Sequence, residues 1–333
     1  MTERVTVLGD GGWGLGLSIV LADHGAEVTL WSHDPAYAEE MRRTRRNPKF
    51  LPGVEIPETV RVTSKMEETV EGHDMLFSVV PTPFLPAVMA QLKPHYRAGV
   101  PVVSATKGID TETLLRPTEI IANALGDVPL VVVTGPSHAE EVSRRMPTTV
   151  VAASSDMGIA RRVQDLLATE RFRVYTSADA IGVEIGGALK NVISIAGGIV
   201  DGLGFGDNTK AALLTRGIVE MSRLGEALGG QRSTFFGLSG IGDLITSCCS
   251  KHGRNRAVGE RLGRGEKLEH ILQGMQQVAE GVKTSLAVQK LSERHGVEMP
   301  ICDEVHQVLF HDKDPGRAVR DLMTRQLKDE VEW

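Results

Sequence analysis

The chain has 333 residues, of which 41% are hydrophobic and 24% charged, a length and composition typical of a folded protein with two domains. Its formal net charge of −6 argues against a nucleic-acid-binding surface, and its aromatic content of 4% argues against a base-stacking one. No apolar run reaches the ~18 residues that a membrane span needs, and no basic segment precedes the first strand. We therefore expect no signal peptide and no stable membrane association.

The first half of the chain alternates strand-like and helix-like segments. Short apolar runs predict strands at residues 5–8, 27–31, 75–80, 100–105, 130–134 and 148–153. Helical patterns follow the first two of these runs, and the proline-rich segment 47–57 is expected to be a surface loop. Nearly continuous apolar strands that alternate with helices indicate a parallel sheet covered on both faces.

After residue 178 the strand-like runs nearly disappear. Helices are predicted at about 179–200, 208–229, 255–263, 268–274, 282–295 and 300–311. The predicted fold is an α/β protein in which an N-terminal Rossmann-type, doubly wound sheet is followed by an all-helical C-terminal domain. We place the NAD(P)-binding domain at residues 1–180 and the helical substrate-binding domain at residues 181–333, with the boundary inside one long helix.

A glycine-rich motif, Gly9-Asp-Gly-Gly-Trp-Gly14, follows the first strand and opens the first helix. In the dinucleotide-binding pattern, Gly9 allows the tight turn, Gly11 lets the backbone approach the pyrophosphate, and Gly14 lets the helix pack closely on the strand. The free N–H groups at the helix start then face the anion. The alternative is a glycine-rich turn without a ligand, which the strand–turn–helix context disfavours.

The end of the second strand decides between NADH and NADPH, because an acid there bonds the ribose 2′-hydroxyl and repels a 2′-phosphate. If the strand ends at Trp31, the residues at its tip are Ser32 and His33, which can bond a 2′-phosphate. Asp34 lies at about the expected distance along the chain, but Pro35 should turn it away. We therefore expect use of NADPH, with NADH as the alternative.

Three polar groups stand out in the helical half. Lys190 lies in an apolar, glycine-rich stretch, where burial would lower the pKa of a lysine toward neutrality and make it an acid–base group, unless the side chain extends to the surface. Asp243 is an isolated acid in a glycine-rich turn and could equally be a helix N-cap. Arg254 and Asn255 could clamp a phosphate, or belong to a solvated loop.

The three cysteines, Cys248, Cys249 and Cys302, show no spacing of a zinc site, and adjacent cysteines rarely form a disulfide. We expect no metal, and reduced thiols that serve as small buried side chains of a cytoplasmic protein.

An ordered set of motifs resembles the NAD(P)-dependent glycerol-3-phosphate dehydrogenase family of glycerolipid synthesis and covers nearly the whole chain. The matching segments are Ser104-Ala-Thr-Lys-Gly, Gly135-Pro-Ser-His-Ala, Gly187-Ala-Leu-Lys-Asn-Val, Asp201-Gly-Leu-Gly-Phe-Gly-Asp-Asn, Leu214-Thr-Arg-Gly, Gly240-Ile-Gly-Asp-Leu, Gly253-Arg-Asn-Arg and Val278-Ala-Glu-Gly. The resemblance implies reversible reduction of dihydroxyacetone phosphate to sn-glycerol 3-phosphate by NADPH or NADH, which supplies the backbone for phospholipid synthesis. We also expect a homodimer.

The resemblance also implies residue roles, with Lys190 as the proton donor and acceptor. The implied substrate site contains Lys107, Gly135, Ser137, Lys190, Asp243, Gly253, Arg254 and Asn255. The implied cofactor site contains Gly9, Gly11, Gly12, Trp13, Gly14, His33, Lys107, Ala139, Arg254, Val278 and Glu280. The family often has serine at the positions of Gly12 and Gly253. Gly253 lacks the serine hydroxyl, and we expect its backbone N–H to donate to the phosphate instead.

Two other functions remain open at this point. One is a dehydrogenase of similar build that acts on a 2- or 3-hydroxy acid, which would need a carboxylate partner and no phosphate clamp. The other is a nucleotide-sensing protein that binds the cofactor without turnover, against which the lysines and the clamp argue.

Overall fold

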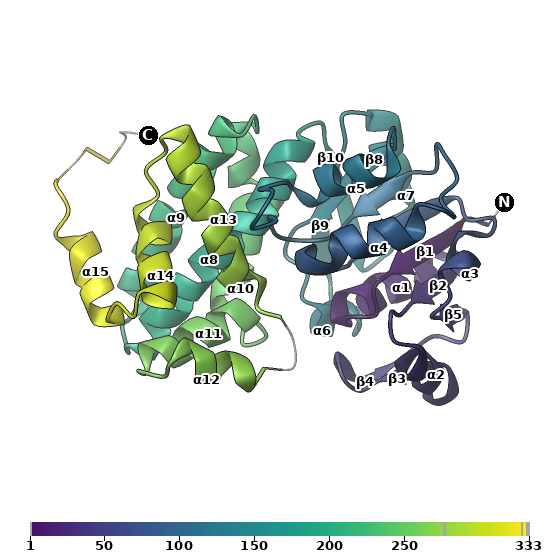
Figure 1. The fold of residues 1–333 in the computed structure, drawn as a ribbon, viewed down its shortest axis with the longest axis horizontal. Helices are drawn as coiled ribbons and strands as arrows, with labels where there is room; N and C mark the ends of the chain where they lie inside the picture. Colours follow the sequence, from purple (N-terminus) through teal and green to yellow (C-terminus); the bar gives the residue numbers. More distant parts are fainter. Residues whose placement is uncertain (1, 276–277, 328, 331–333) are drawn as a thin grey trace. The chain divides into compact units, whose positions relative to one another are not determined.

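The computed structural model describes residues 2–275, 278–327 and 329–330. Its contacts divide the chain into two compact units, one comprising Met1–Lys107 and Arg116–Ala180 and the other Gly108–Leu115 and Ile181–Trp333 (Figure 1). The segment Gly108–Leu115, which the sequence analysis included in the first domain, thus belongs to the helical unit. Ile109 and Leu114 are the physical reason, because both are buried in the core of that unit.

An eight-stranded sheet forms the first unit, with the strand order β10-β9-β8-β7-β6-β1-β2-β5. The strands are β1 (Arg4–Leu8), β2 (Glu27–Trp31), β5 (Val60–Thr63), β6 (Met75–Ser78), β7 (Val102–Ser104), β8 (Leu130–Thr134), β9 (Thr148–Ala153) and β10 (Phe172–Ser177). The sequence predicted a parallel sheet. The observed strands pair in parallel except for β8 and β9, which run antiparallel. The edge strands β5 and β10 were not predicted, because exposed residues interrupt their apolar pattern.

The order of the strands fixes where the helices lie. The chain moves from β1 to β2 in one direction and from β6 through β7 to β8 in the other, and right-handed crossovers then place the connecting helices on opposite faces. Helix α1 packs against α6 and α7, whereas α4 packs against α5. The helices of this unit are α1 (Gly12–His24), α2 (Pro35–Thr44), α3 (Met66–Val70), the short 3-10 helix η1 (Thr82–Phe84), α4 (Leu85–Leu92), α5 (Pro117–Leu125), α6 (Ala139–Val142) and α7 (Met157–Leu167). The reversal of direction at β1 puts a topological switch point beside the glycine-rich loop, as dinucleotide-binding sheets have it.

The proline-rich segment 47–57 is not the surface loop that was expected. It contains most of a two-stranded antiparallel ribbon, formed by β3 (Arg46–Asn47) and β4 (Leu51–Glu55). Three residues anchor this ribbon, because the side chains of Asn47, Leu51 and Ile56 are buried.

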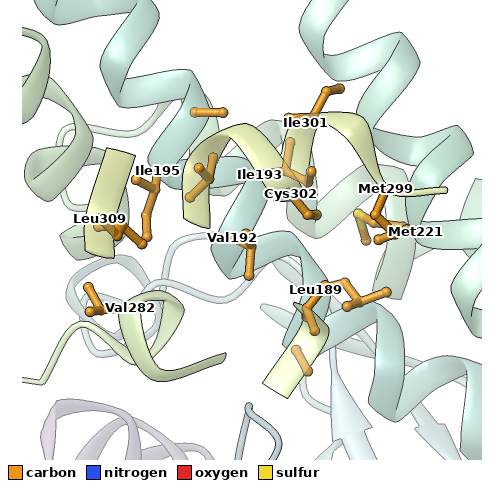
Figure 2. Packing of buried hydrophobic residues seen from close by; sticks show 14 of the residues in the cluster. Leu189, Val192, Ile193, Ile195, Met221, Val282, Met299, Ile301, Cys302 and Leu309 are labelled. Carbon is orange, nitrogen blue, oxygen red and sulfur yellow. The ribbon is translucent and has the colours of Figure 1, made fainter. Parts of the chain in front are cut away.

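The second unit is helical, as predicted. Its helices are α8 (Ala180–Gly202), α9 (Asp207–Ala227), η2 (Arg232–Phe236), η3 (Leu238–Gly242), α10 (Asp243–Cys249), α11 (Arg254–Gly263), α12 (Leu268–Gln273), α13 (Glu280–His295), α14 (Pro300–Phe310) and α15 (Pro315–Met323). Figure 2 shows side chains of α8, among them Leu189, Val192 and Ile193, in the core together with Met221 of α9 and Cys302 of α14. Helix α8 therefore contributes side chains to the core of this unit together with α9 and α14.

Helix α8 corrects one expectation from the sequence. By length and composition it could cross a membrane, although the sequence analysis found no apolar run of that length. Glu184 and Lys190 interrupt its apolar sequence, which is why no uninterrupted run was seen. The apolar stretch is wholly buried inside the helical unit, as in the core helix of a globular domain.

Candidate active site

The glycine-rich loop between β1 and α1 has the geometry that its motif predicts. Gly9 has φ +115°, which favours glycine, and a Cβ on Gly14 would lie 1.9 Å from the carbonyl oxygen of Gly9. Around Gly11, by contrast, a Cβ would meet no atom within 4 Å. The loop is thus closed where α1 packs on β1 and open at Gly11, where a pyrophosphate would need space.

Further residues around this loop suit a dinucleotide. A Cβ on Gly12 would lie 2.9 Å from the carbonyl oxygen of Phe50 and 3.4 Å from Cβ of Ala139, so a serine in this place would be crowded. The indole Nε1 of Trp13 is buried and has no hydrogen-bond partner among the described residues. A buried donor without an acceptor is costly, so this N–H is suited to an acceptor on a bound cofactor.

The tip of β2 differs in part from the sequence-based expectation. The strand ends at Trp31, as assumed, and Asp34 caps α2 by accepting hydrogen bonds from the backbone N–H groups of Ala36 and Tyr37. His33 is exposed. The prediction for Ser32 is wrong, because its side chain is buried and its hydroxyl donates to Asp10 Oδ2 over 2.7 Å instead of facing a 2′-phosphate.

Lys107, Gly135 and Ser137 lie together where β7 and β8 end. The Nζ of Lys107 and the hydroxyl of Ser137 both donate to the carbonyl oxygen of Gly135, over 3.2 and 2.8 Å. Gly135 has φ +143°, and a Cβ there would lie 3.0 Å from Cα of Val150. Ligands bind at the carboxyl ends of strands in open α/β sheets, and here a glycine turn holds an ammonium and a hydroxyl at this edge.

Lys190 of α8 is buried in an ion pair rather than extended to the surface. Its Nζ lies 3.1 Å from Oδ1 of Asp243 and donates to the hydroxyl of Ser247 over 2.6 Å. Lys190 is 7% exposed and Asp243 2% exposed, so both charges are shielded from water. The sequence analysis considered the burial of Lys190 alone and did not anticipate a carboxylate beside its ammonium.

Small residues on one face of α8 allow η3 and α10 to lie close to it. A Cβ on Gly186 would lie 2.7 Å from the carbonyl oxygen of Ser239, and one on Gly197 would lie 3.2 Å from Cβ of Cys248. Between these glycines, the hydroxyl of Ser194 donates to the carbonyl oxygen of Ser247 over 2.8 Å. Asp243 is the first residue of α10, directly after the π-helical turn η3, and is held against Lys190 by this contact.

The segment around Arg254 forms the start of α11, and a second glycine contact sets its place beside α8. Both helices carry two glycines four residues apart, namely Gly198 and Gly202 on α8 and Gly259 and Gly263 on α11. A Cβ on Gly198 would lie 2.0 Å from the carbonyl oxygen of Arg256, and one on Gly259 would lie 1.9 Å from that of Ile195. The two backbones are therefore in direct contact.

The residues of the predicted phosphate clamp are in different situations. Arg254 is exposed at the first position of α11, where helix N–H groups favour anions. Arg256 is engaged elsewhere, since its Nε donates to Asp201 over 2.7 Å. The expectation for Gly253 is wrong, because its N–H donates to the carbonyl oxygen of Ser250 over 3.2 Å. A Cβ on Gly253 would lie 2.8 Å from the carbonyl oxygen of Ser247, which explains why a serine fits poorly here.

Asn255 connects three helices. Its Nδ2 donates to Oδ1 of Asn191 on α8 over 2.9 Å, and its Oδ1 accepts from the N–H of Gly281 on α13 over 3.0 Å. One of the two Nδ2 hydrogens is thus used within the helical unit. Val278 is exposed just before α13, and Glu280 is the first residue of that helix.

Sequence reasoning missed two residues that contact the site, Ser247 and Asp10. Ser247 follows Asp243 by four positions on α10, a spacing that puts both side chains on one helix face and could have found it. Asp10 occupies a variable position of the glycine motif and gave no signal. One thiol was also misjudged, because Cys249 is exposed whereas Cys248 and Cys302 are buried.

Comparison with known proteins agrees with this geometry. Residues 4–160 match the family NAD-dependent glycerol-3-phosphate dehydrogenase N-terminus, and residues 179–320 match its C-terminus. The chain is 50% identical over 335 residues to glycerol-3-phosphate dehydrogenase (NAD(P)+) of Geobacter sulfurreducens, with 99% of both chains covered. It is 46% identical over 331 residues to the enzyme of that name from Chlorobium phaeobacteroides, covering 98% of this chain and 99% of that one.

Among solved structures, glycerol-3-phosphate dehydrogenase from Coxiella burnetii matches with a TM-score of 0.94 at 38% identity, covering 97% of this chain and 99% of that one. The two family matches and the relatives of nearly equal length thus point to the same family. The chain belongs to the NAD-dependent glycerol-3-phosphate dehydrogenase family.

Proposed function

We propose that this protein catalyses the reversible, NAD(P)H-dependent reduction of dihydroxyacetone phosphate to sn-glycerol 3-phosphate. The observation that carries the proposal is the buried Lys190, held by Asp243 and Ser247 in the helical unit. Such an ammonium is positioned to protonate an oxygen that gains negative charge. Family membership supports the assignment, and so does the glycine-rich loop.

When bound, the nicotinamide cofactor supplies the hydride that reduces C2 of the ketone. The open space at Gly11 and the buried Nε1 of Trp13 fit such a group, and Gly9, Gly12, Gly14, His33 and Ala139 complete the proposed contacts in the first unit. Val278 and Glu280 are proposed as cofactor contacts from the helical unit.

Lys190 is the proposed proton donor. Its Nζ gives a proton to the ketone oxygen during reduction and takes it back from the alcohol in the reverse direction. Asp243 and Ser247 orient the ammonium through their hydrogen bonds.

The remaining proposed residues bind the substrate. Arg254, at the start of α11, is proposed to bond the phosphate, with the second amide hydrogen of Asn255 as a further donor. Lys107, with Gly135 and Ser137 beside it, is proposed to contact both substrate and cofactor. Binding energy at the phosphate would then orient the reacting carbon. Gly253 is proposed only as the residue whose small size allows this turn.

We propose further that the enzyme is a cytoplasmic homodimer without stable membrane association, which supplies glycerol phosphate for phospholipid synthesis. The free state of all three cysteines supports a reducing compartment. The wholly buried apolar stretch of α8 supports the absence of a membrane anchor.

The test is an assay of NADH and NADPH oxidation with dihydroxyacetone phosphate as substrate. Parallel reactions contain pyruvate and other 2-keto acids, which a hydroxy-acid dehydrogenase would reduce. Turnover of the 2-keto acids alone would contradict the proposal. Cofactor binding without turnover of any substrate would favour a nucleotide-sensing protein instead.

A further inference from the structure

A carboxylate lies at the end of β2, but it comes from the glycine-rich loop and not from the strand. Oδ2 of Asp10 accepts a hydrogen bond from the hydroxyl of Ser32, the residue that follows the last residue of β2. In dinucleotide-binding folds the acid at this strand end recognises the adenosine ribose. The chain has no acid at position 32 or 33, and the one at position 34 caps a helix. Asp10 thus brings a negative charge to the place where the strand lacks one.

The surrounding residues hold Asp10 in this position. The side chain of Asn47, which is fully buried, donates from Nδ2 to the carbonyl oxygen of Asp10 over 2.6 Å. Oδ1 of Asn47 in turn accepts from the hydroxyl of Tyr37 over 2.7 Å. The β3–β4 ribbon therefore fixes the backbone of Asp10, while Ser32 fixes its carboxylate.

The charge of Asp10 is not neutralised by a nearby cation in the described part of the chain. Its carboxylate is bonded by a hydroxyl, and Asp10 forms no ion pair with any described lysine, arginine or histidine. Asp10 is 5% exposed, so water screens this charge poorly. This charge also acts on Tyr37. Burial is the main cause that raises the pKa of Tyr37, and the negative charge of Asp10 adds to the rise.

We propose that Asp10 is a specificity-determining residue that disfavours a 2′-phosphorylated cofactor, so that the enzyme uses NADH more efficiently than NADPH. This inference rests on the proposed dehydrogenase function. Two effects act in the same direction. The carboxylate repels the dianionic 2′-phosphate, and it also accepts the hydrogen bond that the Ser32 hydroxyl could otherwise donate to that phosphate.

The test compares the wild type with Asp10→Asn, which keeps the size of the side chain and removes its charge. Dissociation constants for ADP-ribose and 2′-phospho-ADP-ribose are measured by titration calorimetry, so that the readout does not depend on turnover. We expect the wild type to bind ADP-ribose more tightly. Asp10→Asn should shift the ratio of the two constants by about 10-fold or more toward the 2′-phosphorylated ligand. The ratio of kcat/KM for NADPH and NADH should shift with it.

Ser32→Ala is the matched control, because it removes the hydroxyl partner and retains the carboxylate. It should leave the preference for ADP-ribose in place. An equal shift in Ser32→Ala and Asp10→Asn would assign the selectivity to Ser32 and overturn the proposal. A wild type that binds 2′-phospho-ADP-ribose more tightly would also overturn it, and this comparison needs no variant to fold. An unchanged ratio in Asp10→Asn with full turnover of dihydroxyacetone phosphate would refute the role of Asp10 and leave the proposed function intact. If the wild type binds the two ligands selectively but does not turn over dihydroxyacetone phosphate, the proposed function is refuted and the role of Asp10 stands.

Discussion

Lys190 and Asp243 are 53 positions apart in the chain, yet their side chains form an ion pair with 3.1 Å between Nζ and Oδ1. Both groups are buried, so removal of either one takes an opposite charge away from the other in a place that water screens poorly. The pair therefore ties the proposed proton donor to the packing of α8 against α10.

Replacement of Lys190 tests the proposed proton transfer. Lys190→Ala should lower kcat by about 10²-fold or more, because a general acid is lost, and leave the affinity for NADH nearly unchanged. Loss of the buried ion pair with Asp243 should also lower the free energy of unfolding by about 3 kcal/mol or more. Lys190→Arg is the control, since a guanidinium restores the charge but does not release its proton. We expect this variant to regain stability and remain slow; retention of more than half of the wild-type kcat in either variant would refute the role of Lys190.

Arg254→Ala tests the proposed phosphate contact. The variant should raise KM for dihydroxyacetone phosphate much more than KM for unphosphorylated dihydroxyacetone, because a charged hydrogen bond contributes roughly 1.5–3 kcal/mol. Lys251→Ala is the control, since Lys251 is an exposed cation three positions earlier on the same segment. It should change both constants little. Equal effects of Arg254→Ala on the two substrates would show that Arg254 acts through the fold or the cofactor.

The raised pKa of Glu220 predicts that the free energy of unfolding depends on pH. The residue lies inside the helical unit, where its carboxylate accepts hydrogen bonds from the backbone N–H groups of Ile301 and Cys302 at the start of α14. Burial raises the pKa of Glu220 to about 8, although these hydrogen bonds act to lower it. The folded protein then binds a proton that the unfolded chain, with a glutamate pKa of about 4.3, has lost. The stabilisation is complete below pH ~4 and is lost as pH rises toward and through 8.

The melting temperature of the wild type should therefore fall between pH 6.5 and 8.5. Glu220→Gln cannot ionise and should reduce this fall. Burial also raises the pKa of Asp303 to about 6. Most of the stabilisation that Asp303 contributes is therefore already lost at pH 6.5, where this range begins. A Glu220→Gln variant with the same pH dependence as the wild type would show that Glu220 is ionised in the folded protein throughout.

Gly259→Ala tests the contact between α8 and α11. Its Cβ would lie 1.9 Å from the carbonyl oxygen of Ile195, and neither backbone can yield without moving a helix. We expect a loss of about 1–3 kcal/mol of stability, typical of overpacking. Gly316→Ala in α15 is the control, because its Cβ would meet only the carboxylate of Asp314 at 3.2 Å. A loss of stability of similar size in both variants would mean that the contact between α8 and α11 is not its cause.

The sequence predicted those parts of the site that depend on local geometry. Gly9 and Gly14 could be assigned because their turn and helix contact admit no side chain. Lys190 could be found because a lysine in an apolar helix contrasts with its neighbours. The partners of Lys190 in the structure, by contrast, lie more than fifty positions away, and local patterns carry no information on such pairs.

The errors have related causes. The segment 108–115 carries no periodic pattern, so nothing indicated that Ile109 and Leu114 pack in the helical core. Ser32 was expected to bond a 2′-phosphate because it directly follows the second strand. Its hydroxyl is used by Asp10, whose motif position accepts many residues and therefore drew no attention.

The composition of α8 has a consequence during protein synthesis. Until α9 to α14 have been translated, this 23-residue apolar helix lacks the core side chains that those helices later contribute, and it has the length and composition of a membrane-spanning segment. Lys190 lies close to its midpoint, where a lysine disfavours insertion into a bilayer by about 2.5–3.5 kcal/mol. The side chain proposed to donate a proton thus raises the free energy of inserting this segment into a bilayer, and replacement of Lys190 by leucine would remove that contribution.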